Sequence, residues 1–137
     1  MPASLERLKV TEWDYRFFEQ SEFACPCCGE AEMDGEFMRK LVNLRLAAKM
    51  PLIINSGYRC PEHNDRVGGA SNSPHMEGVA ADIRVKGAEA RSLVGAAEFC
   101  GFTGIGVSQR GDWSSRFIHV DIAQRQTDRP RPWLWSY

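Results

Sequence analysis

The feature that most constrains this chain is a pair of short segments in which histidine and aspartate stand close together. The first segment runs from Ser73 to Asp82 and contains His75, and the second is His119-Val120-Asp121. The chain has only three histidines, and two of them lie in these segments. Two histidines and one carboxylate are the protein ligands of many catalytic zinc sites, which leave a fourth position open for water or substrate. The hypothesis is therefore a fold organised around one zinc ion.

Length and composition predict a single globular domain over residues 1–137. The chain is 43% hydrophobic and 26% charged, as ordinary soluble domains are. No apolar run approaches the length of a membrane span, and the first six residues lack the basic-then-apolar order of a signal peptide. A net charge of −1 predicts no nucleic-acid partner, and the locally basic stretch 124–131 is interpreted as solvated surface. Nothing in the sequence predicts an oligomeric state.

The cysteines exclude a complete set of intrachain disulfides, because the chain has five of them. Cys25, Cys27 and Cys28 crowd together, which suits a turn that binds metal or that pairs with a distant cysteine such as Cys60. A zinc ribbon needs a second close pair, and Cys60 and Cys100 lie too far apart in sequence to form one. The pattern therefore favours a structural disulfide or a locally packed turn over structural zinc, and a redox role is the least favoured.

Periodicity predicts two helices. From Asp34 to Met50, apolar residues recur at helical spacing, with Asp34 as the N-cap and Pro51 as the stop. A second helix covers 88–100 and is closed by Gly101. Residues 1–33 carry several aromatic side chains without strong periodicity, which predicts an irregular wrap over part of the core.

Four short strands are predicted between and after these helices. They cover 52–54, 80–85, 104–107 and 117–122, and the last two are joined as a hairpin. A turn is expected at 55–57, followed by a long ordered loop over 58–74. In the last strand the aliphatic residues Ile118, Val120 and Ile122 share one face, so His119 and Asp121 face the opposite side. Together these elements predict an α+β domain with a small, mainly antiparallel sheet flanked by at least two helices.

The ligand segments resemble a known family. Ser73-x-His75-x-x-Gly78-x-Ala80-x-Asp82 reproduces the SxHxxGxAxD signature of the M15 zinc peptidases, a group of D-Ala-D-Ala carboxypeptidases and peptidoglycan endopeptidases with a hedgehog-like fold. His119-Val120-Asp121 is similar to the third-ligand motif of that family. The segments 56–61, 63–64 and 67–70 resemble the stretch before the first ligand. The resemblance covers about residues 52–133, the motif-bearing core.

The resemblance implies that His75, Asp82 and His119 bind Zn2+. It also implies that Arg59 contacts substrate and stabilises developing negative charge, for which a forked guanidinium is well suited. A surface ion pair is the alternative role for Arg59.

The general base is not given by the family pattern. Many relatives carry an acidic residue or a histidine two or three positions before the last ligand, where this chain has Arg116 and Phe117. Asp121 is the preferred candidate, because it shares a strand face with His119 and could accept a proton from the attacking water. The alternative is that Asp121 orients a ligand histidine. Asp112 is interpreted as a turn residue.

By resemblance, the expected function is zinc-dependent hydrolysis of a peptide bond in peptidoglycan stem peptides, as a carboxypeptidase or an endopeptidase. A phage origin is expected, with a product that is cytoplasmic until lysis or is associated with the virion. Two alternatives stay open, a non-catalytic zinc-binding interaction module and a structural phage component.

Overall fold

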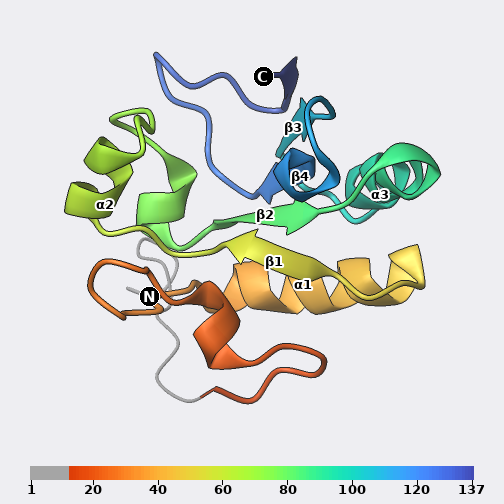
Figure 1. The fold of residues 1–137 in the computed structure, drawn as a ribbon, viewed down its shortest axis with the longest axis horizontal. Helices are drawn as coiled ribbons and strands as arrows, with labels where there is room; N and C mark the ends of the chain where they lie inside the picture. The colour runs from red at the N-terminus through yellow and green to blue at the C-terminus, as the bar shows by residue number, and fades with distance from the viewer. Residues whose placement is uncertain (1–12) are drawn as a thin grey trace.

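The computed structural model describes residues 13–137, so the predictions for the first twelve residues, including the absent signal peptide, lie outside it. The described part is an α+β fold whose five-stranded sheet has the order β1-β2-β4-β3-β5 (Figure 1). The strands are β1 Ile53–Ser56, β2 Ala80–Arg84, β3 Gly104–Ser108, β4 Phe117–Asp121 and β5 Trp133–Ser136. The α-helices are α1 Gly35–Ala48, α2 Pro61–Arg66 and α3 Gly87–Phe99. The 3-10 turns are η2 Gln20–Phe23, η3 Pro74–Glu77 and η4 Trp113–Ser115. This confirms the predicted fold class.

Antiparallel pairing dominates the sheet and fixes the position of the two ligand strands. β4 lies between β2 and β3 and is antiparallel to both, whereas β5 runs parallel to β3 at the edge. In the β2–β4 ladder, Asp82 is the direct cross-strand partner of His119. Side chains of such partners leave the sheet on the same face. The register therefore brings two predicted ligands together.

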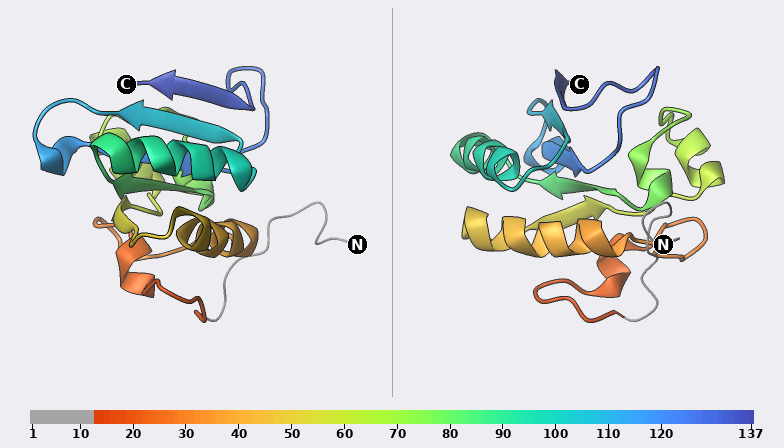
Figure 2. Two further views of the ribbon diagram at one scale, coloured as in Figure 1. Left: turned by 90° about the vertical axis from the view of Figure 1, so that its right-hand side faces the viewer. Right: turned by 180° about the vertical axis from the view of Figure 1, so that it is seen from behind.

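One face of the sheet packs on the helices. α1 and α3 contact each other, and α3 also contacts β4 (Figures 1 and 2). Ile83, Ile118 and Val120 are almost fully buried in the same core cluster as the apolar residues of α1 and α3. The predicted facing of β4 is confirmed by this packing. Asp82 and His119 consequently lie on the other face.

Helix α1 begins and ends as the sequence predicts. The Asp34 side chain accepts a hydrogen bond from the Phe37 backbone N–H at 3.0 Å, and Lys49 ends the helix in the left-handed region at φ 56°. Phe37, Leu41 and Leu44 are fully buried. Each such side chain contributes about 1.5–3 kcal/mol by its removal from water, so packing, more than helix propensity, holds α1 in place. Among residues 13–137, no helix is long and apolar enough to cross a membrane.

Two local predictions were wrong, and one strand was missed. The expected loop over 58–74 contains α2, a helix of six residues that begins after Cys60 with Pro61 in its first turn. β1 continues through Ser56, where a turn was expected, and its pairing with β2 is irregular between Ile54 and Ser56. The edge strand β5 was not predicted, because its pairing with β3 depends on contacts between segments far apart in sequence.

Gly78 joins the motif segment to the N-terminal segment. Its φ is +71°, and a Cβ built on it would collide with the Glu32 carbonyl oxygen. The Gly78 carbonyl in turn accepts a hydrogen bond of 2.9 Å from the Asp34 N–H. Only glycine combines this torsion with so close a backbone approach.

Candidate metal centre

The three predicted ligands come from three different elements. His75 lies in η3, where the Ser73 side chain accepts a hydrogen bond of 3.3 Å from the His75 backbone N–H. Asp82 is in the middle of β2, and His119 is its partner on β4. All three side chains are buried, with at most 7% of the residue exposed. The ligand atoms that they offer lie within 4.8 Å of one another, as a shared metal ion requires.

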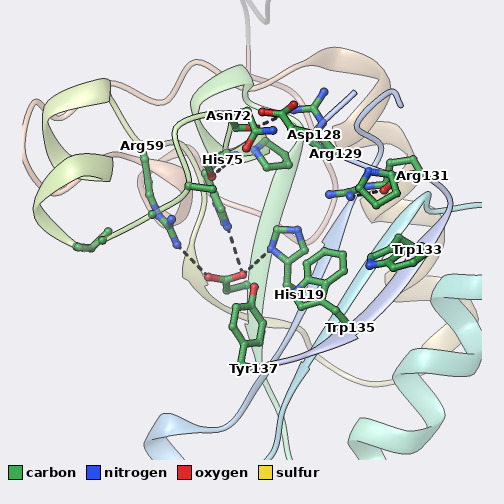
Figure 3. A pocket seen from close by; sticks show the side chains of 18 of the residues that line it. Arg59, Asn72, His75, His119, Asp128, Arg129, Arg131, Trp133, Trp135 and Tyr137 are labelled. Atoms are coloured by element: carbon green, nitrogen blue, oxygen red, sulfur yellow. Dashed lines mark hydrogen bonds and ion pairs between the residues drawn. The ribbon is translucent and has the colours of Figure 1, made fainter. Parts of the chain in front are cut away.

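Asp82 is the centre of this cluster, and the ion pairs that join its carboxylate to His75 and His119 are drawn as dashed lines in Figure 3. Its Oδ1 atom lies 3.0 Å from Nδ1 of His119 and 3.3 Å from Nε2 of His75. The centroids of the two imidazole rings are 5.1 Å apart. Two nitrogens and one carboxylate oxygen thus converge on one point.

The orientation of His75 fits a metal ligand. Its Nδ1 lies 2.7 Å from the Gly57 carbonyl oxygen, which can only accept a hydrogen bond, so Nδ1 carries the proton. Nε2 is then the unprotonated nitrogen, and it carries the free lone pair. That atom is buried and has no hydrogen-bond partner. An unpartnered buried nitrogen is costly, and a metal ion would satisfy it.

Electrostatics at the cluster favour a cation. Burial alone would raise the pKa of Asp82, but His75 and His119 hold it well below its usual range. Burial alone would lower the pKa of His119, yet the carboxylates of Asp121 and Asp82, which accept hydrogen bonds from its ring, raise it to about 9. Without a metal, the site thus holds a proton strongly. The negative charges of Asp82 and Asp121 would stabilise a divalent cation in the same way.

Asp121 lies behind His119. Its Oδ2 is 2.7 Å from Nε2 of His119, and it accepts two hydrogen bonds from Arg131 at 2.8 and 3.0 Å. It also accepts one from the Ala123 N–H at 3.0 Å, and none of its surface is exposed. His119 and Arg131 hold the pKa of this buried carboxyl well below its usual range, although burial itself acts to raise it. Of the two roles open for Asp121, these contacts favour orienting the histidine.

Arg59 lies on the other side of Asp82. Its Nη2 is 3.3 Å from Oδ2 of Asp82, and its remaining nitrogens contact Asn64 Oδ1 and the Ser56 hydroxyl. The side chain is 16% exposed. Arg59 is therefore held beside the cluster and is no surface ion pair, while part of its guanidinium still reaches solvent.

The cluster forms the floor of a pocket of about 580 Å³. Its walls are formed by the glycine-rich stretch after α2 on one side and by the C-terminal segment on the other (Figure 3). Arg129 and Arg131 belong to this wall, and their side chains are only 5% and 7% exposed. The interpretation of 124–131 as solvated surface was therefore wrong for these two arginines. A substrate would enter a pocket lined by paired charged groups and by aromatic side chains.

Several pocket residues were not found from the sequence. The Trp135 ring packs against the His119 ring with centroids 5.1 Å apart, and it lies so close to Gly106 that a Cβ there would meet the indole at 2.6 Å. The guanidinium of Arg131 also lies over this indole, 5.0 Å from its centroid. Only the strand pairing of β5 shows that Trp135 packs on a ligand. The one signal for this contact was the combination of a bulky residue, Trp135, with a glycine, Gly106, that faces it.

Comparisons with known proteins agree with this geometry. The model of the family described as Peptidase M15 matches residues 16–121. A zinc D-Ala-D-Ala carboxypeptidase of Streptomyces albus G is 44% identical over 69 residues, which are 50% of this chain. The matched residues cover 27% of the length of that relative, so this half of the chain corresponds to about a quarter of it.

Proposed function

This chain belongs to the peptidase M15 family, and from that premise we propose that it is a zinc-dependent peptidase that cuts a peptide bond in peptidoglycan stem peptides. The observation that carries the proposal is the buried cluster of His75, Asp82 and His119, with an unpartnered Nε2, at the floor of an open pocket. The D-Ala-D-Ala carboxypeptidase named above supports the choice of substrate class. A phage origin and release by lysis stay predictions from the sequence.

His75 would hold zinc through Nε2, His119 through Nδ1 and Asp82 through a carboxylate oxygen. When bound, zinc supplies a Lewis acid that polarises the scissile carbonyl and lowers the pKa of water. The protein's part is to fix these donors. The Gly57 carbonyl holds the tautomer and ring plane of His75, and Asp121 does the same for His119.

We assign Arg59 to the substrate. Its guanidinium is anchored by Ser56, Asn64 and Asp82 and still reaches solvent. An anchored guanidinium can bind a peptide carboxylate or stabilise an oxyanion without reorganisation during the reaction. Arg129 and Arg131 also line the pocket, but each is paired with a carboxylate, Glu77 at 2.6 Å and Asp121 at 2.8 Å. The preference for an anionic group therefore depends on Arg59.

Two carboxylates, Asp121 and Asp128, are compared as the group that could accept a proton during the reaction. Asp121 was predicted as the proton acceptor, but its hydrogen bonds to His119, Arg131 and Ala123 support an orienting role. Apart from Asp82, Asp128 is the carboxylate among the described residues that line the pocket. Asp128 is exposed, so it can meet substrate and solvent.

The test is digestion of purified peptidoglycan, with mass analysis of the released fragments. We expect new amine and carboxyl ends with the zinc-loaded protein and none with Asp82→Asn, His119→Ala or a chelated sample. Asp65→Asn is the matched control, because Asp65 is an exposed aspartate outside the pocket, and it should cut like the wild type. The fragment masses identify the bond and distinguish a carboxypeptidase from an endopeptidase.

The opposite outcome is equally informative. If the wild type binds zinc through these residues and releases no fragment, the peptidase proposal fails. The replacement of the usual acidic position by Arg116 and Phe117 would then mark a zinc-binding interaction module.

A further inference from the structure

A second group of metal-binding side chains lies outside the pocket. The sulfur atoms of Cys25, Cys28 and Cys60 lie within 4.8 Å of one another, and none of the three residues lines the pocket. Cys25 and Cys60 are 3.6 Å apart through their sulfur atoms, too far for a disulfide bond of about 2.05 Å. All five cysteines are free thiols. The predicted partner Cys60 is thus in place, but as a member of a cluster.

The backbone around Cys25 is shaped like a metal-binding turn. Cys25-Pro26-Cys27-Cys28-Gly29 contains a C-x-x-C spacing, and its turn is closed by a hydrogen bond of 2.8 Å from the Gly29 N–H to the Cys25 carbonyl. Gly29 has φ +78°, which the turn requires. Two cysteines at this spacing are the usual half of a structural zinc site.

Backbone N–H groups are directed at the two buried sulfur atoms. The Cys60 N–H donates to Cys25 Sγ and the His63 N–H donates to Cys60 Sγ, both at 3.4 Å. Such donors stabilise thiolates, which are the form that binds metal.

Cys27 offers a fourth sulfur beside this group, although it is not one of the three sulfur atoms that lie within 4.8 Å of one another. Its thiol interacts with that of Cys60, and Arg66 Nη1 donates to it at 3.4 Å. Four thiolates around a divalent ion leave two negative charges, and a guanidinium in contact with one sulfur offsets part of that charge. With zinc–sulfur bonds of about 2.3 Å, tetrahedral sulfurs are about 3.8 Å apart, close to the 3.6 Å between Cys25 and Cys60.

We propose that Cys25, Cys27, Cys28 and Cys60 bind a structural zinc ion, distinct from the ion of the pocket. This ion fastens the N-terminal segment to the stretch that carries Arg59. Cys60 directly follows Arg59 and caps α2, and the Arg59 N–H donates to the His75 carbonyl at 3.2 Å. The site therefore holds the position of a substrate-binding arginine without contacting substrate.

The experiment measures zinc content and cobalt spectra of protein purified under reducing conditions. We expect two zinc ions per wild-type chain, one in His119→Ala, and almost none when Cys28→Ser is added to His119→Ala. Cys28 is exposed, so its serine variant should fold. In the His119→Ala background, cobalt should give an intense thiolate-to-metal charge-transfer band, which Cys28→Ser abolishes.

Cys100→Ser is the matched control, because Cys100 lies outside the cluster and should lose neither metal nor the cobalt band. The proposal is overturned if His119→Ala holds no zinc and gives no thiolate band with cobalt. It is also overturned if mass analysis of the freshly purified protein finds a Cys25–Cys60 disulfide instead of bound metal. Because these results are read in the His119→Ala background, they do not depend on peptidase activity.

Discussion

At the scale of single residues, His119 is held between two carboxylates. Asp82 lies at its Nδ1 and Asp121 at its Nε2, so both ring nitrogens are occupied and the ring cannot turn. Arg131 in turn holds Asp121 with two hydrogen bonds. The lone pair on Nδ1 of His119 is thus directed by a chain of four charged or ionisable groups, which are Asp82, His119, Asp121 and Arg131.

This arrangement predicts the effect of Asp121→Asn. If Asp121 orients His119, zinc affinity should fall by about 10- to 100-fold, and kcat should recover when zinc is saturating. Zinc affinity and kcat at saturating zinc are the measurements. Asp128→Asn is the comparison, since it leaves His119 untouched and should bind zinc like the wild type. A kcat of Asp121→Asn that stays low with zinc bound would instead identify Asp121 as the proton acceptor.

The sequence predicted the cluster but not its surroundings. The motifs that contain His75, Asp82 and His119 have a spacing that can be read directly from the sequence. The structure brings the three residues together. Arg131 could not be found in this way, because it lies in a basic, proline-containing stretch that resembles solvated surface. Its role depends on the pairing of the C-terminal strand β5 alongside β3, which no local pattern predicts.

At the scale of elements, the turn at Gly78 links η3 to β2 and presses against the N-terminal segment. We expect Gly78→Ala to be destabilising for two reasons. A residue with a Cβ pays about 1–2 kcal/mol for the left-handed conformation, and the collision with the Glu32 carbonyl should add about 1–3 kcal/mol. The free energy of unfolding from urea titration is the measurement.

Gly87→Ala is the matched control. Gly87 also has positive φ, at +62°, but a Cβ there would meet nothing within 4 Å. It should therefore show the cost of the torsion alone. Equal losses in the two variants would show that the N-terminal segment yields to the added Cβ, and that it does not fix the turn.

The elements that the sequence predicted share strong local signals. α1 has a capping aspartate and a buried stripe of apolar residues, and β4 alternates cleanly between its two faces. α2 was missed because it is short and polar, so only its cap at Cys60 and Pro61 marks it. β5 was missed because its residues are largely exposed, and its place in the sheet depends on tertiary contacts.

At the scale of the whole molecule, each proposed ion binds segments that are distant in sequence. The pocket ion would join η3, β2 and β4, and the cysteine site would join the N-terminal segment to α2. An ion that binds only the folded chain stabilises it, by about 2.7 kcal/mol when its free concentration is 100 times Kd. Zinc should thus act on stability as well as on chemistry.

This predicts a dependence of Tm on zinc that can be assigned to the pocket alone. In the Cys28→Ser background, Tm should rise with zinc concentration. Adding His119→Ala should abolish the rise, whereas adding Asp65→Asn should not change it. Thermal unfolding followed by circular dichroism is the measurement. A rise that persists in the His119→Ala variant would place the stabilising ion elsewhere.

The direct pairing of Asp82 with His119 also determines when, during folding, the chain can first hold its ion. The two residues belong to strands that are separated along the chain by α3 and β3. A slip of one residue in this ladder would send the two side chains to opposite faces of the sheet. Because such non-local pairing is the slow part of sheet formation, metal affinity should arise late in folding. An ion that is then bound stabilises the correctly aligned strands relative to the misaligned ones.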